Sequence, residues 1–384
     1  MKPKMHRLPR VCFVGMESLP VLAKEYNHHG IGGEQVQHTL LAQAFARRGY
    51  PTSMIVGDYG QPDGAFWDGI QVWKAYAPDE GLPVLRFFYP KWWKLIAALR
   101  RANPEVIYLS CAGGLLGQVA LWAKRRGLRI VFRLAHDRDC EPGNLILPRH
   151  TYQRDKRLYE YGLRRASKVL AQTEHQRDLL RRNYGVESVV AGMLVATEPA
   201  GRPLAERDID VLWVSNIRQL KRPDLLLQLA QRLPGVQFHM VGGPQLEEAA
   251  LYNSIESEAR GIANVAFHGR LPYHDVNELY ARAKVFVNTS DTEGFPNSYL
   301  QAWVRGTPVV AFFDPDGVIE RESLGHRPRD LAEMQDIVRR LVHSESARTT
   351  LGAACTRFMA ERFGEDQTLQ PYVDAFSGAM TSTQ

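Results

Sequence analysis

The stretch from Ala283 to Phe312 constrains the fold of this chain more than any other, because three kinds of local signal follow one another in it. Val285–Val287 is a short apolar run with the composition of a buried strand. Ser290–Gly294 is a polar turn. Pro296 then suits the first position of a helix, where the N–H that proline lacks has no partner to lose. A strand that leads through a turn directly into a helix indicates the first half of a βαβ unit.

The second half of the unit follows at once. The helix is predicted over Asn297–Arg305, and Gly306 ends it. Val309–Phe313 supplies the next strand. In open α/β sheets ligands bind beyond the carboxyl ends of the strands, and a helix N-terminus there offers free N–H groups to an anion. Glu293 on the turn and Gln301 in the helix can both face such a ligand site.

Length and composition are those of a globular protein with room for two α/β domains: 384 residues, 45% hydrophobic and 23% charged. Four cysteines are scattered without a C-x-x-C pair, so the sequence predicts neither a zinc site nor a disulfide framework and suits a reducing compartment. The apolar run from Val11 stops at Glu17, too short for a signal peptide, and nowhere do about 18 uncharged apolar residues follow one another. We therefore expect a cytoplasmic protein without membrane-spanning helices.

The net charge of +6 is unevenly distributed, because Arg86–Tyr184 carries 21 Lys and Arg against 8 Asp and Glu. This excess indicates an anionic surface or substrate, although a solvated basic face explains it equally well. The overlapping stretch Gly81–Arg101 mixes aromatic and basic residues and allows two interpretations: an amphipathic helix at a membrane interface, or a domain helix whose tryptophans pack inward. Its apolar residues include Trp92, Trp93, Ile96 and Leu99.

A glycine-rich loop, Gly30–Gly33, separates the first predicted strand, Val11–Gly15, from a helix that closes at Arg48. Strand, glycine loop and helix can cradle a phosphate, because glycine lets backbone N–H groups approach the anion. G-x-G-G is not the dinucleotide fingerprint G-x-G-x-x-G, and no acid clearly follows at the required distance. A nicotinamide-dependent oxidoreductase is therefore disfavoured.

Two further predicted strands end in polar side chains. His136 follows the strand Arg129–Leu134 at its carboxyl end, where open sheets bind ligands; taken alone, it is as readily structural as functional. Arg218 and Lys221 follow the strand Asp210–Ser215 on a polar turn. A guanidinium fork and an ammonium point charge suit a diphosphate, so we interpret this turn as an anion-binding loop rather than an exposed cationic turn.

The stretch that begins at Glu293 resembles the E-G-F-P-N-x-x-L-E-A signature of the retaining GT-B glycosyltransferases of glycosyltransferase family 4. The matching positions are Glu293, Gly294, Phe295, Pro296, Asn297, Leu300 and Ala302. The resemblance implies that this segment binds the donor, that Glu293 hydrogen-bonds donor-sugar hydroxyls and that the second acid binds the ribose. Gln301 stands in place of that acid, so one hydrogen bond to ribose is kept and roughly 1 kcal/mol of charge-assisted binding is lost.

The N-terminal half resembles the family's G-G-x-x-x-H-x-x-x-L-A-x-x-L-x-x-R-G pattern. The matching residues are Gly32, Gly33, His38 (shifted by one position), Ala42, Arg48 and Gly49. The resemblance implies that Gly32 and Gly33 bind the donor, with Gly33 facing its diphosphate. It also implies a catalytic His136 beside the donor sugar, with Asp137 and Asp139 near acceptor hydroxyls.

The basic turn resembles the family's G-R-x-x-x-x-K-G loop, whose Arg and Lys neutralise the leaving diphosphate. Lys221 matches that lysine, Asn216 occupies the place of the arginine, and Arg218 comes two residues later. The resemblance assigns catalytic roles to Arg218 and Lys221. Farther on, Arg270 and Leu271 resemble the loop that holds the nucleotide base through backbone contacts.

The resemblance covers nearly the whole chain and implies the GT-B fold: two Rossmann-like domains that face each other across a deep cleft. We expect an acceptor domain over residues 1–196, a nucleotide-sugar donor domain over 209–357 and a C-terminal helix over 358–384 that crosses back to the first domain. Thr197–Asp208 has the composition of a linker.

The activity implied is transfer of a sugar, with retention of configuration, from a nucleotide-sugar to a saccharide or lipid-linked acceptor in the synthesis of cell-surface polysaccharide or glycoconjugate. By analogy with the same family we expect no metal and no cofactor, with a UDP-sugar favoured over a GDP-sugar as substrate. Peripheral binding to the inner face of an anionic membrane is a further expectation; nucleic acid is not an expected partner.

Other functions stay open. Gln301 and the displaced Arg218 also suit a sugar- or nucleotide-binding protein descended from a transferase and weakened in catalysis. A nucleotide-sugar epimerase would share the fold, but its catalytic acids have no evident place in the sequence.

Overall fold

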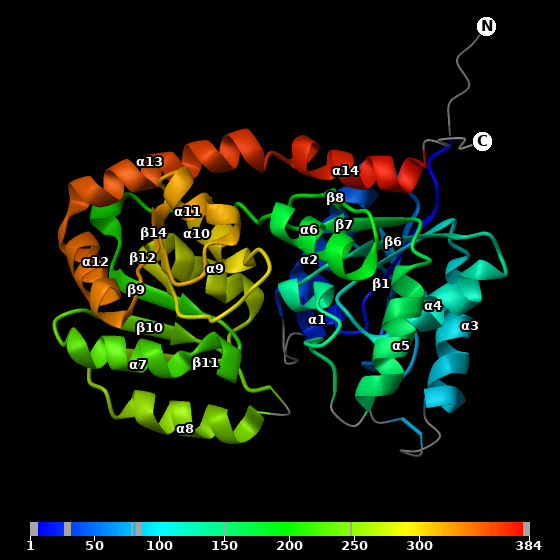
Figure 1. The fold of residues 1–384 in the computed structure, drawn as a ribbon, viewed down its shortest axis with the longest axis horizontal. Helices are drawn as coiled ribbons and strands as arrows, with labels where there is room; N and C mark the ends of the chain where they lie inside the picture. The colour runs from blue at the N-terminus through cyan, green and yellow to red at the C-terminus, as the bar shows by residue number, and fades with distance from the viewer. Residues whose placement is uncertain are drawn as a thin grey trace, which may run out of the picture. The chain divides into compact units, whose positions relative to one another are not determined.

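The computed structural model describes residues 7–26, 32–77, 80–81, 87–148, 151–245 and 248–378. They form two compact units (Figure 1). The first comprises the described residues up to Leu194 together with those from Thr368 onward, and the second runs from Val195 to Gln367. Each unit is built on a largely parallel sheet with helices on its faces, so the predicted α/β class with two Rossmann-like domains is confirmed. Gly30 and Ile31 of the glycine-rich loop lie outside the described residues.

The first sheet has the strand order β3-β4-β2-β1-β5-β6-β7-β8. Its strands are β1 (Val11–Val14), β2 (Thr52–Val56), β3 (Phe66–Trp67), β4 (Ile70–Lys74), β5 (Val106–Ser110), β6 (Arg129–Arg133), β7 (Lys168–Ala171) and β8 (Val189–Val190). All neighbours pair in parallel except β3 and β4. The sequence analysis did not predict this antiparallel pair at the edge of the sheet.

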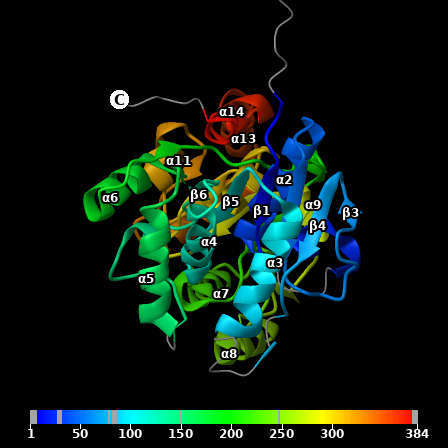
Figure 2. The ribbon, with the colours of Figure 1, turned by 90° about the vertical axis from the view of Figure 1, so that its right-hand side faces the viewer.

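Apolar clusters on both faces hold the helices of the first unit to the sheet. Those helices are α1 (Leu19–Leu22), α2 (Gly33–Arg47), α3 (Trp93–Ala102), α4 (Gly114–Lys124), α5 (Tyr152–Leu163), α6 (Glu174–Tyr184) and α14 (Glu365–Ser377). Side chains of α3, α4, α5 and α6 form one cluster with the sheet. Figure 2 shows the ribbons of these four helices. On the other face, Phe13 of β1 packs against Phe45 of α2 and Phe376 of α14. The end of the chain therefore completes the core of the first unit.

Helix α3 packs on the sheet of the first unit as a domain helix, which was one of the two interpretations of this stretch. Ile96 and Leu99 are buried in the core, and Trp92 packs against the same cluster. Trp93 points outward and is 59% exposed. The apolar face predicted for a membrane interface is thus mostly used inside the unit.

The second sheet has the order β11-β10-β9-β12-β13-β14, and every pair is parallel. Its strands are β9 (Ile209–Val214), β10 (Phe238–Val241), β11 (Val265–Gly269), β12 (Ala283–Asn288), β13 (Val309–Ala311) and β14 (Gly325–His326). Its helices are α7 (Pro223–Arg232), α8 (Ala249–Arg260), α9 (Tyr273–Arg282), α10 (Asn297–Trp303), α11 (Val318–Arg321), α12 (Leu331–His343) and α13 (Glu345–Arg362).

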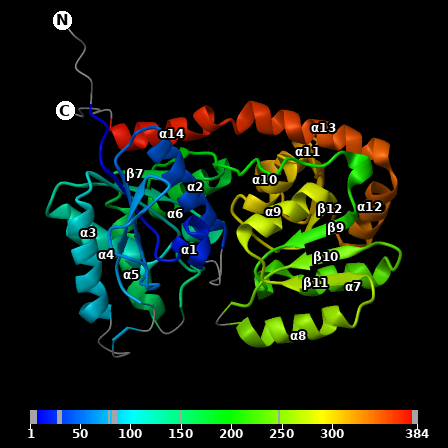
Figure 3. The same ribbon diagram turned by 180° about the vertical axis from the view of Figure 1, so that it is seen from behind.

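Successive side chains of β12 point to opposite faces of the sheet, and each face is covered by a different set of helices of the second unit. Val285 and Val287 join the apolar cluster formed with side chains of α7, α8 and α12. Figure 3 shows these three helices. Phe286 points the other way and contacts Tyr280 of α9 and Tyr299 of α10. The βαβ unit predicted from the sequence is therefore present as β12, α10 and β13.

The boundaries of this unit differ slightly from the prediction. Pro296 caps α10 with an extended backbone instead of occupying its first helical position. The helix ends at Trp303, two residues before Arg305, and Gly306 adopts a positive φ of 65° that suits glycine. Among the described residues, none of the helices has both the length and the apolar content that crossing a membrane requires.

Candidate functional site

The second sheet has a topological switch point between β9 and β12. The chain leaves β9 towards β10 and β11 on one side and returns to pair with β9 through β12 on the other. Loops that follow two such strands diverge at the carboxyl edge of the sheet, which is where open α/β sheets bind ligands. The loop after β9 carries Arg218 and Lys221, and the loop after β12 carries Glu293.

Lys221 and Glu293 meet beyond this switch point. Lys221 Nζ lies 2.5 Å from Glu293 Oε2. The second carboxylate oxygen, Oε1, accepts from Ser290 Oγ at 2.7 Å and from Asn288 Nδ2 at 3.4 Å. Glu293 is only 8% exposed. A carboxylate this buried is stabilised by its cation and its hydrogen-bond donors, and the sequence had not indicated that the two residues touch.

Contacts between the two loops hold this pair in place. Asp291 N donates to the carbonyl oxygen of Leu220 at 3.0 Å. Thr289 Oγ1 donates to the carbonyl oxygen of Lys221 at 2.8 Å and accepts from Trp213 Nε1 of β9 at 3.1 Å. The positions of the carboxylate and the ammonium group are therefore fixed by the backbones on which they stand.

Arg218 has a different partner from Lys221. Its Nε lies 3.5 Å from Glu248 Oε1, and Gln219 N donates to the other oxygen of the same carboxylate. Arg222 pairs with Asp224 and Asp291 instead, and those carboxylates raise the pKa of Arg222. The basic turn is thus a set of cations individually balanced by acids. The role of Glu248 as the partner of this turn was not predicted, because Glu248 lies about 30 residues farther along the chain than Arg218 and Gln219.

Gln301 is buried and its amide contacts two other side chains. Its Nε2 donates to Tyr273 Oη at 2.9 Å, and its Oε1 accepts from Arg305 Nη1 at 2.8 Å. Arg305 also donates from Nη2 to the carbonyl oxygens of Glu198 and Ala196, at 3.0 and 3.3 Å. The guanidinium therefore connects α10 with the segment that begins the second unit.

The remaining predicted donor residues surround these groups. Phe295 packs its ring against Trp303 and Phe363, so this side chain contributes to the apolar core. Gly294 and Pro296 are buried, and Asn297 begins α10. Arg270 donates to the carbonyl oxygen of Pro244 at 3.1 Å, just before the half-buried Leu271. A Cβ on Gly243 would come within 2.5 Å of Arg270 Nε, so glycine there makes room for this arginine.

The first unit has its own switch point, between β1 and β5, and a half-buried acid, Glu34, lies there. Gly32 precedes α2 with extended backbone, Gly33 is its first residue, and Glu34 follows. Glu34 Oε1 accepts from Ser110 Oγ of β5 at 2.6 Å and lies 3.0 Å from His38 Nδ1. A glutamate four residues before a histidine, directly after the glycines, is the sequence signal that could have identified it.

Electrostatics favour ionised Glu34. Burial opposes its ionisation, but His38, Ser110 and Arg133 together hold the pKa of Glu34 below its ordinary value. Arg133 is the last residue of β6 and is 1% exposed, beside Tyr108 and Tyr372. The carboxylate therefore ties the first turn of α2 to the ends of β5 and β6.

His136 and the two aspartates after it form a tight loop beyond β6. His136 Nδ1 accepts from Arg138 N at 3.1 Å. Asp139 Oδ2 accepts from the backbone N–H groups of Ala135 and His136 at 2.8 and 3.2 Å, and burial raises the pKa of Asp139 to about 6. Asp137 Oδ1 accepts from Gln176 at 3.0 Å. Both carboxylates are buried and used within the unit, and their contact with acceptor hydroxyls stays a prediction.

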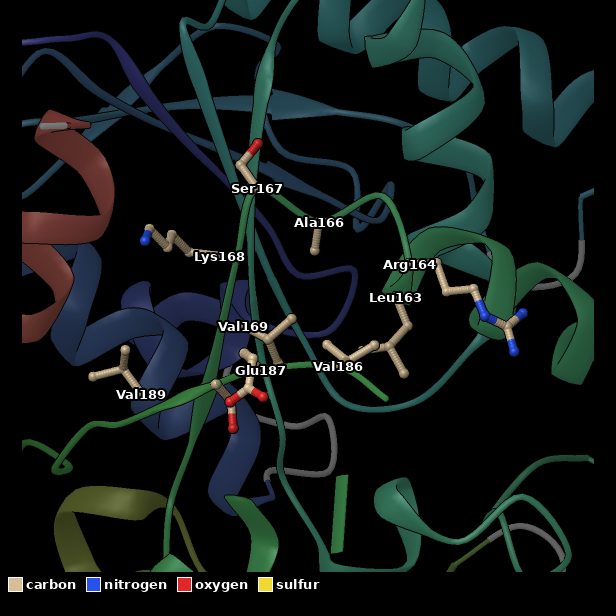
Figure 4. A pocket seen from close by; sticks show the side chains of 10 residues that line it. Leu163, Arg164, Ala166, Ser167, Lys168, Val169, Val186, Glu187 and Val189 are labelled. Atoms are coloured by element: carbon tan, nitrogen blue, oxygen red, sulfur yellow. The ribbon is translucent and has the colours of Figure 1, made fainter. Parts of the chain in front are cut away.

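A cavity of about 300 Å³ lies elsewhere in the first unit (Figure 4). Its lining comes from three places: the end of α5 (Leu163 and Arg164), the start of β7 (Lys168) and the residues before β8 (Val186 and Glu187). These are the amino ends of the strands. The cavity is therefore at the opposite edge of the sheet from Glu34 and His136.

Two family models match this chain: "Glycosyl transferase 4-like domain" over residues 32–191 and "Glycosyl transferases group 1" over residues 208–344. Together with the two parallel sheets they define a GT-B architecture. The chain belongs to the GT-B glycosyltransferases of family 4, the glycosyl transferases group 1.

Curated relatives and solved structures agree with this assignment. A D-inositol 3-phosphate glycosyltransferase from Streptosporangium roseum is 29% identical over 248 residues, which span 56% of each chain, so the match covers about half of that relative's length. The Anabaena protein HepE, solved with UDP and glucose, is similar in fold with a TM-score of 0.75 and 18% identity, over 96% of this chain and all of HepE. Sucrose-phosphate synthase from Thermosynechococcus elongatus gives a TM-score of 0.74 and 18% identity over 94% and 96% of the two chains.

Proposed function

We propose that this chain transfers a sugar from a nucleotide-sugar to a hydroxyl group of a saccharide or lipid-linked acceptor, with retention of configuration, in polysaccharide or glycoconjugate synthesis. The observation that supports this most directly is the contact between Lys221 and Glu293 beyond the β9/β12 switch point. A carboxylate can accept from sugar hydroxyls, and an ammonium group beside it can meet a diphosphate. Family membership supports the same reaction class.

In the proposed reaction the bond between the anomeric carbon and the leaving phosphate oxygen breaks, and the acceptor oxygen bonds to the same face of that carbon. The acceptor proton passes to the leaving phosphate oxygen, so no side-chain base is needed. Lys221 and Arg218 stabilise the charge that develops on the diphosphate. We further propose that Glu293 orients the sugar and that His136 takes part in catalysis. We propose that these cations make a metal ion unnecessary.

The first test is a thermal-shift measurement of the purified chain against UDP, GDP, ADP and their sugars, with and without added Mg²⁺. A ligand at 100 times its dissociation constant adds about 2.7 kcal/mol to the free energy of unfolding. We expect UDP and its sugars to stabilise the chain without metal, in line with the UDP that the HepE structure contains. Stabilisation by none of them at millimolar concentration would contradict a nucleotide-sugar site.

The second test measures release of nucleoside diphosphate from the stabilising donor in the presence of acceptors. The panel contains oligosaccharides, lipid-linked saccharides and inositol 3-phosphate, the last because it stands in the names of the relatives. We expect release that depends on one acceptor class and on Glu293. Products with inverted anomeric configuration would contradict the proposed retention.

A catalytically weakened nucleotide- or sugar-binding protein is the second candidate. One observation favours it: the Gln301 amide is already used by Tyr273 and Arg305 in the buried interior. That candidate predicts stabilisation by nucleotides without transfer or donor hydrolysis. Acceptor-dependent turnover of more than a few per minute would exclude it.

We also propose peripheral association of the first unit with anionic membranes. Tyr89 and Trp93 are 71% and 59% exposed, and Lys91 and Lys94 lie close to them in the sequence. Sedimentation with phosphatidylglycerol vesicles at low salt tests this. We expect Trp93→Ala to reduce the bound fraction several-fold; equal sedimentation with neutral and anionic vesicles would contradict it.

A further inference from the structure

The carboxylate of Glu248 contacts two donors of the basic turn at once. Its Oε1 lies 3.5 Å from Arg218 Nε, and its Oε2 accepts from the backbone N–H of Gln219 at 2.5 Å. A guanidinium and a backbone N–H that converge on one anion are also the donors that bind phosphate oxygens in proteins. Glu248 therefore uses donors that the leaving diphosphate of the proposed reaction would need.

The backbone holds Glu248 beside the turn. Glu248 directly precedes α8, and its own N–H donates to the carbonyl oxygen of Gln245 at 2.9 Å. The loops after β9 and β10 are also joined, because Ile217 N donates to the carbonyl oxygen of Gly243 at 3.0 Å. The carboxylate is therefore close to any anion that Arg218 binds.

Three of the acids that face this turn differ in how easily an anion could replace them. Glu293 is 8% exposed and is hydrogen-bonded within its own loop. Asp224 accepts two hydrogen bonds from Arg222, at 3.0 and 2.8 Å. The side chains of Glu248 and Arg218 are 28% and 29% exposed, and their contact is longer. Because half-exposed ion pairs contribute little to stability, Glu248 is the acid that a diphosphate would displace at the lowest cost.

We propose that Glu248 competes with the diphosphate of the donor for Arg218 and for the N–H of Gln219. When a nucleotide-sugar binds, its phosphate oxygens replace the carboxylate at these donors. When the nucleoside diphosphate leaves after transfer, the carboxylate contacts both donors again. Glu248 thereby limits the affinity of the site for its product. This inference rests on the proposed nucleotide-sugar site and adds a residue that regulates product release from it.

Isothermal titration of the full chain with UDP and with uridine tests the inference. Glu248→Gln keeps the size of the side chain and removes its charge. We expect this variant to lower the Kd of UDP about five-fold, the ratio that corresponds to a half-exposed ion pair that no longer has to be broken. Uridine carries no phosphate, so its Kd should stay within about two-fold of the wild-type value.

A double-mutant cycle shows whether Arg218 carries the effect. In an Arg218→Gln background the carboxylate has no guanidinium to release, so Glu248→Gln should change the Kd of UDP by less than about two-fold. Glu256→Gln is the matched control, because it removes the same charge from α8, where Glu256 pairs with Arg260. We expect its Kd for UDP to equal that of the wild type.

Three results would overturn the inference. Weaker binding of UDP to Glu248→Gln would mean that the acid positions Arg218 for the diphosphate. An unchanged Kd would mean that the carboxylate and the diphosphate do not share donors. Equal tightening of UDP and uridine would place the effect away from the phosphates. Absence of UDP binding by both the wild type and Glu248→Gln would contradict the proposed function itself, and is thereby distinguishable.

Discussion

Each unit of this chain places a glutamate beyond a topological switch point; Glu293 is buried and Glu34 is half-buried, and the two differ in the side chains that they contact. Glu34 and Glu293 each accept a short hydrogen bond from a serine hydroxyl, Ser110 or Ser290. Glu293 also contacts Lys221, whose long side chain stands on an adjacent loop. Glu34 contacts His38 on its own helix. Both carboxylates therefore accept a hydrogen bond from a serine, but the basic side chain beside each stands on a different loop in one unit and on the same helix in the other.

The difference lies in what a ligand could displace. Lys221 can turn from Glu293 towards a diphosphate, because its ammonium group has three donors on a flexible stem. His38 is fully buried, and the nearby Arg133 is 1% exposed. We infer that Glu293 serves chemistry and that Glu34 serves the architecture of the first unit.

The largest expected effect comes from removing the charge of Glu293. Glu293→Gln should lower turnover roughly 100-fold, the cost typical of losing a preorganised polar contact in a reaction centre. Donor-dependent release of nucleoside diphosphate measures it. The matched variant Glu34→Gln should keep turnover within about three-fold. Comparable losses in the two variants would break the functional contrast between the acids.

Removing the cation of the second unit comes next. Lys221→Ala should weaken UDP binding about ten-fold or more, because the diphosphate loses a charge-assisted contact. Titration calorimetry checks this, with Lys284→Ala as control, since that lysine pairs with Asp210 on the strands. An unaltered Kd for UDP in Lys221→Ala would show that Lys221 neutralises the charge of Glu293 and does not contact the diphosphate.

Glu34, the half-buried acid of the first unit, should affect the stability of the protein and the pH dependence of that stability. Glu34→Gln should lower the free energy of unfolding by about 1–3 kcal/mol at pH 7, as for a weakened buried hydrogen-bonded group. The folded-state pKa of Glu34 is below 4.5, its ordinary value. This contribution is therefore fully present above pH 4.5 and is lost as the pH falls through the folded-state pKa.

Urea titrations of both proteins between pH 3 and 8 measure this prediction. The difference between wild type and Glu34→Gln should shrink on the acid side. A difference that grows as the pH falls would contradict an ionised, stabilising Glu34.

The smallest effects come from the two hydroxyls. Ser110→Ala should cost about 1 kcal/mol of stability without changing turnover, whereas Ser290→Ala should slow turnover a few-fold with little change in Tm. Thermal unfolding and initial rates on the same preparations compare them. The opposite pattern would assign the catalytic carboxylate to the first unit.

Much of the fold and part of the site were predictable from the sequence. Strand–loop–helix order is local, so β9, β12, α10 and β13 were predicted, and Glu293 and Lys221 with them. Their contact was not, because it depends on β12 returning to pair with β9 after about 70 residues. The short β3 and helix α8 were missed, since two residues or a mostly polar stretch give little periodic signal.

Side chains that complete the sites from a distance were also missed. Ser110 reaches Glu34 across 76 positions, and Tyr273 reaches Gln301 across 28. Such pairs follow from sheet order and helix packing, which no local pattern encodes. For Ile96 and Leu99 the local pattern itself was visible, because the helix is amphipathic. That pattern did not show whether the apolar face packs on the protein core or on a membrane.

The hydrogen bonds of Arg305 have an evolutionary consequence. One guanidinium serves both Gln301 and the backbone of Ala196 and Glu198, so a substitution at position 301 alters the charge balance of a group that also anchors the connecting segment. We expect position 301, position 305 and the length of that segment to covary among homologues. Lineages that carry glutamate at position 301 should tolerate replacement of the arginine less readily, because a buried carboxylate would then be left without a cation.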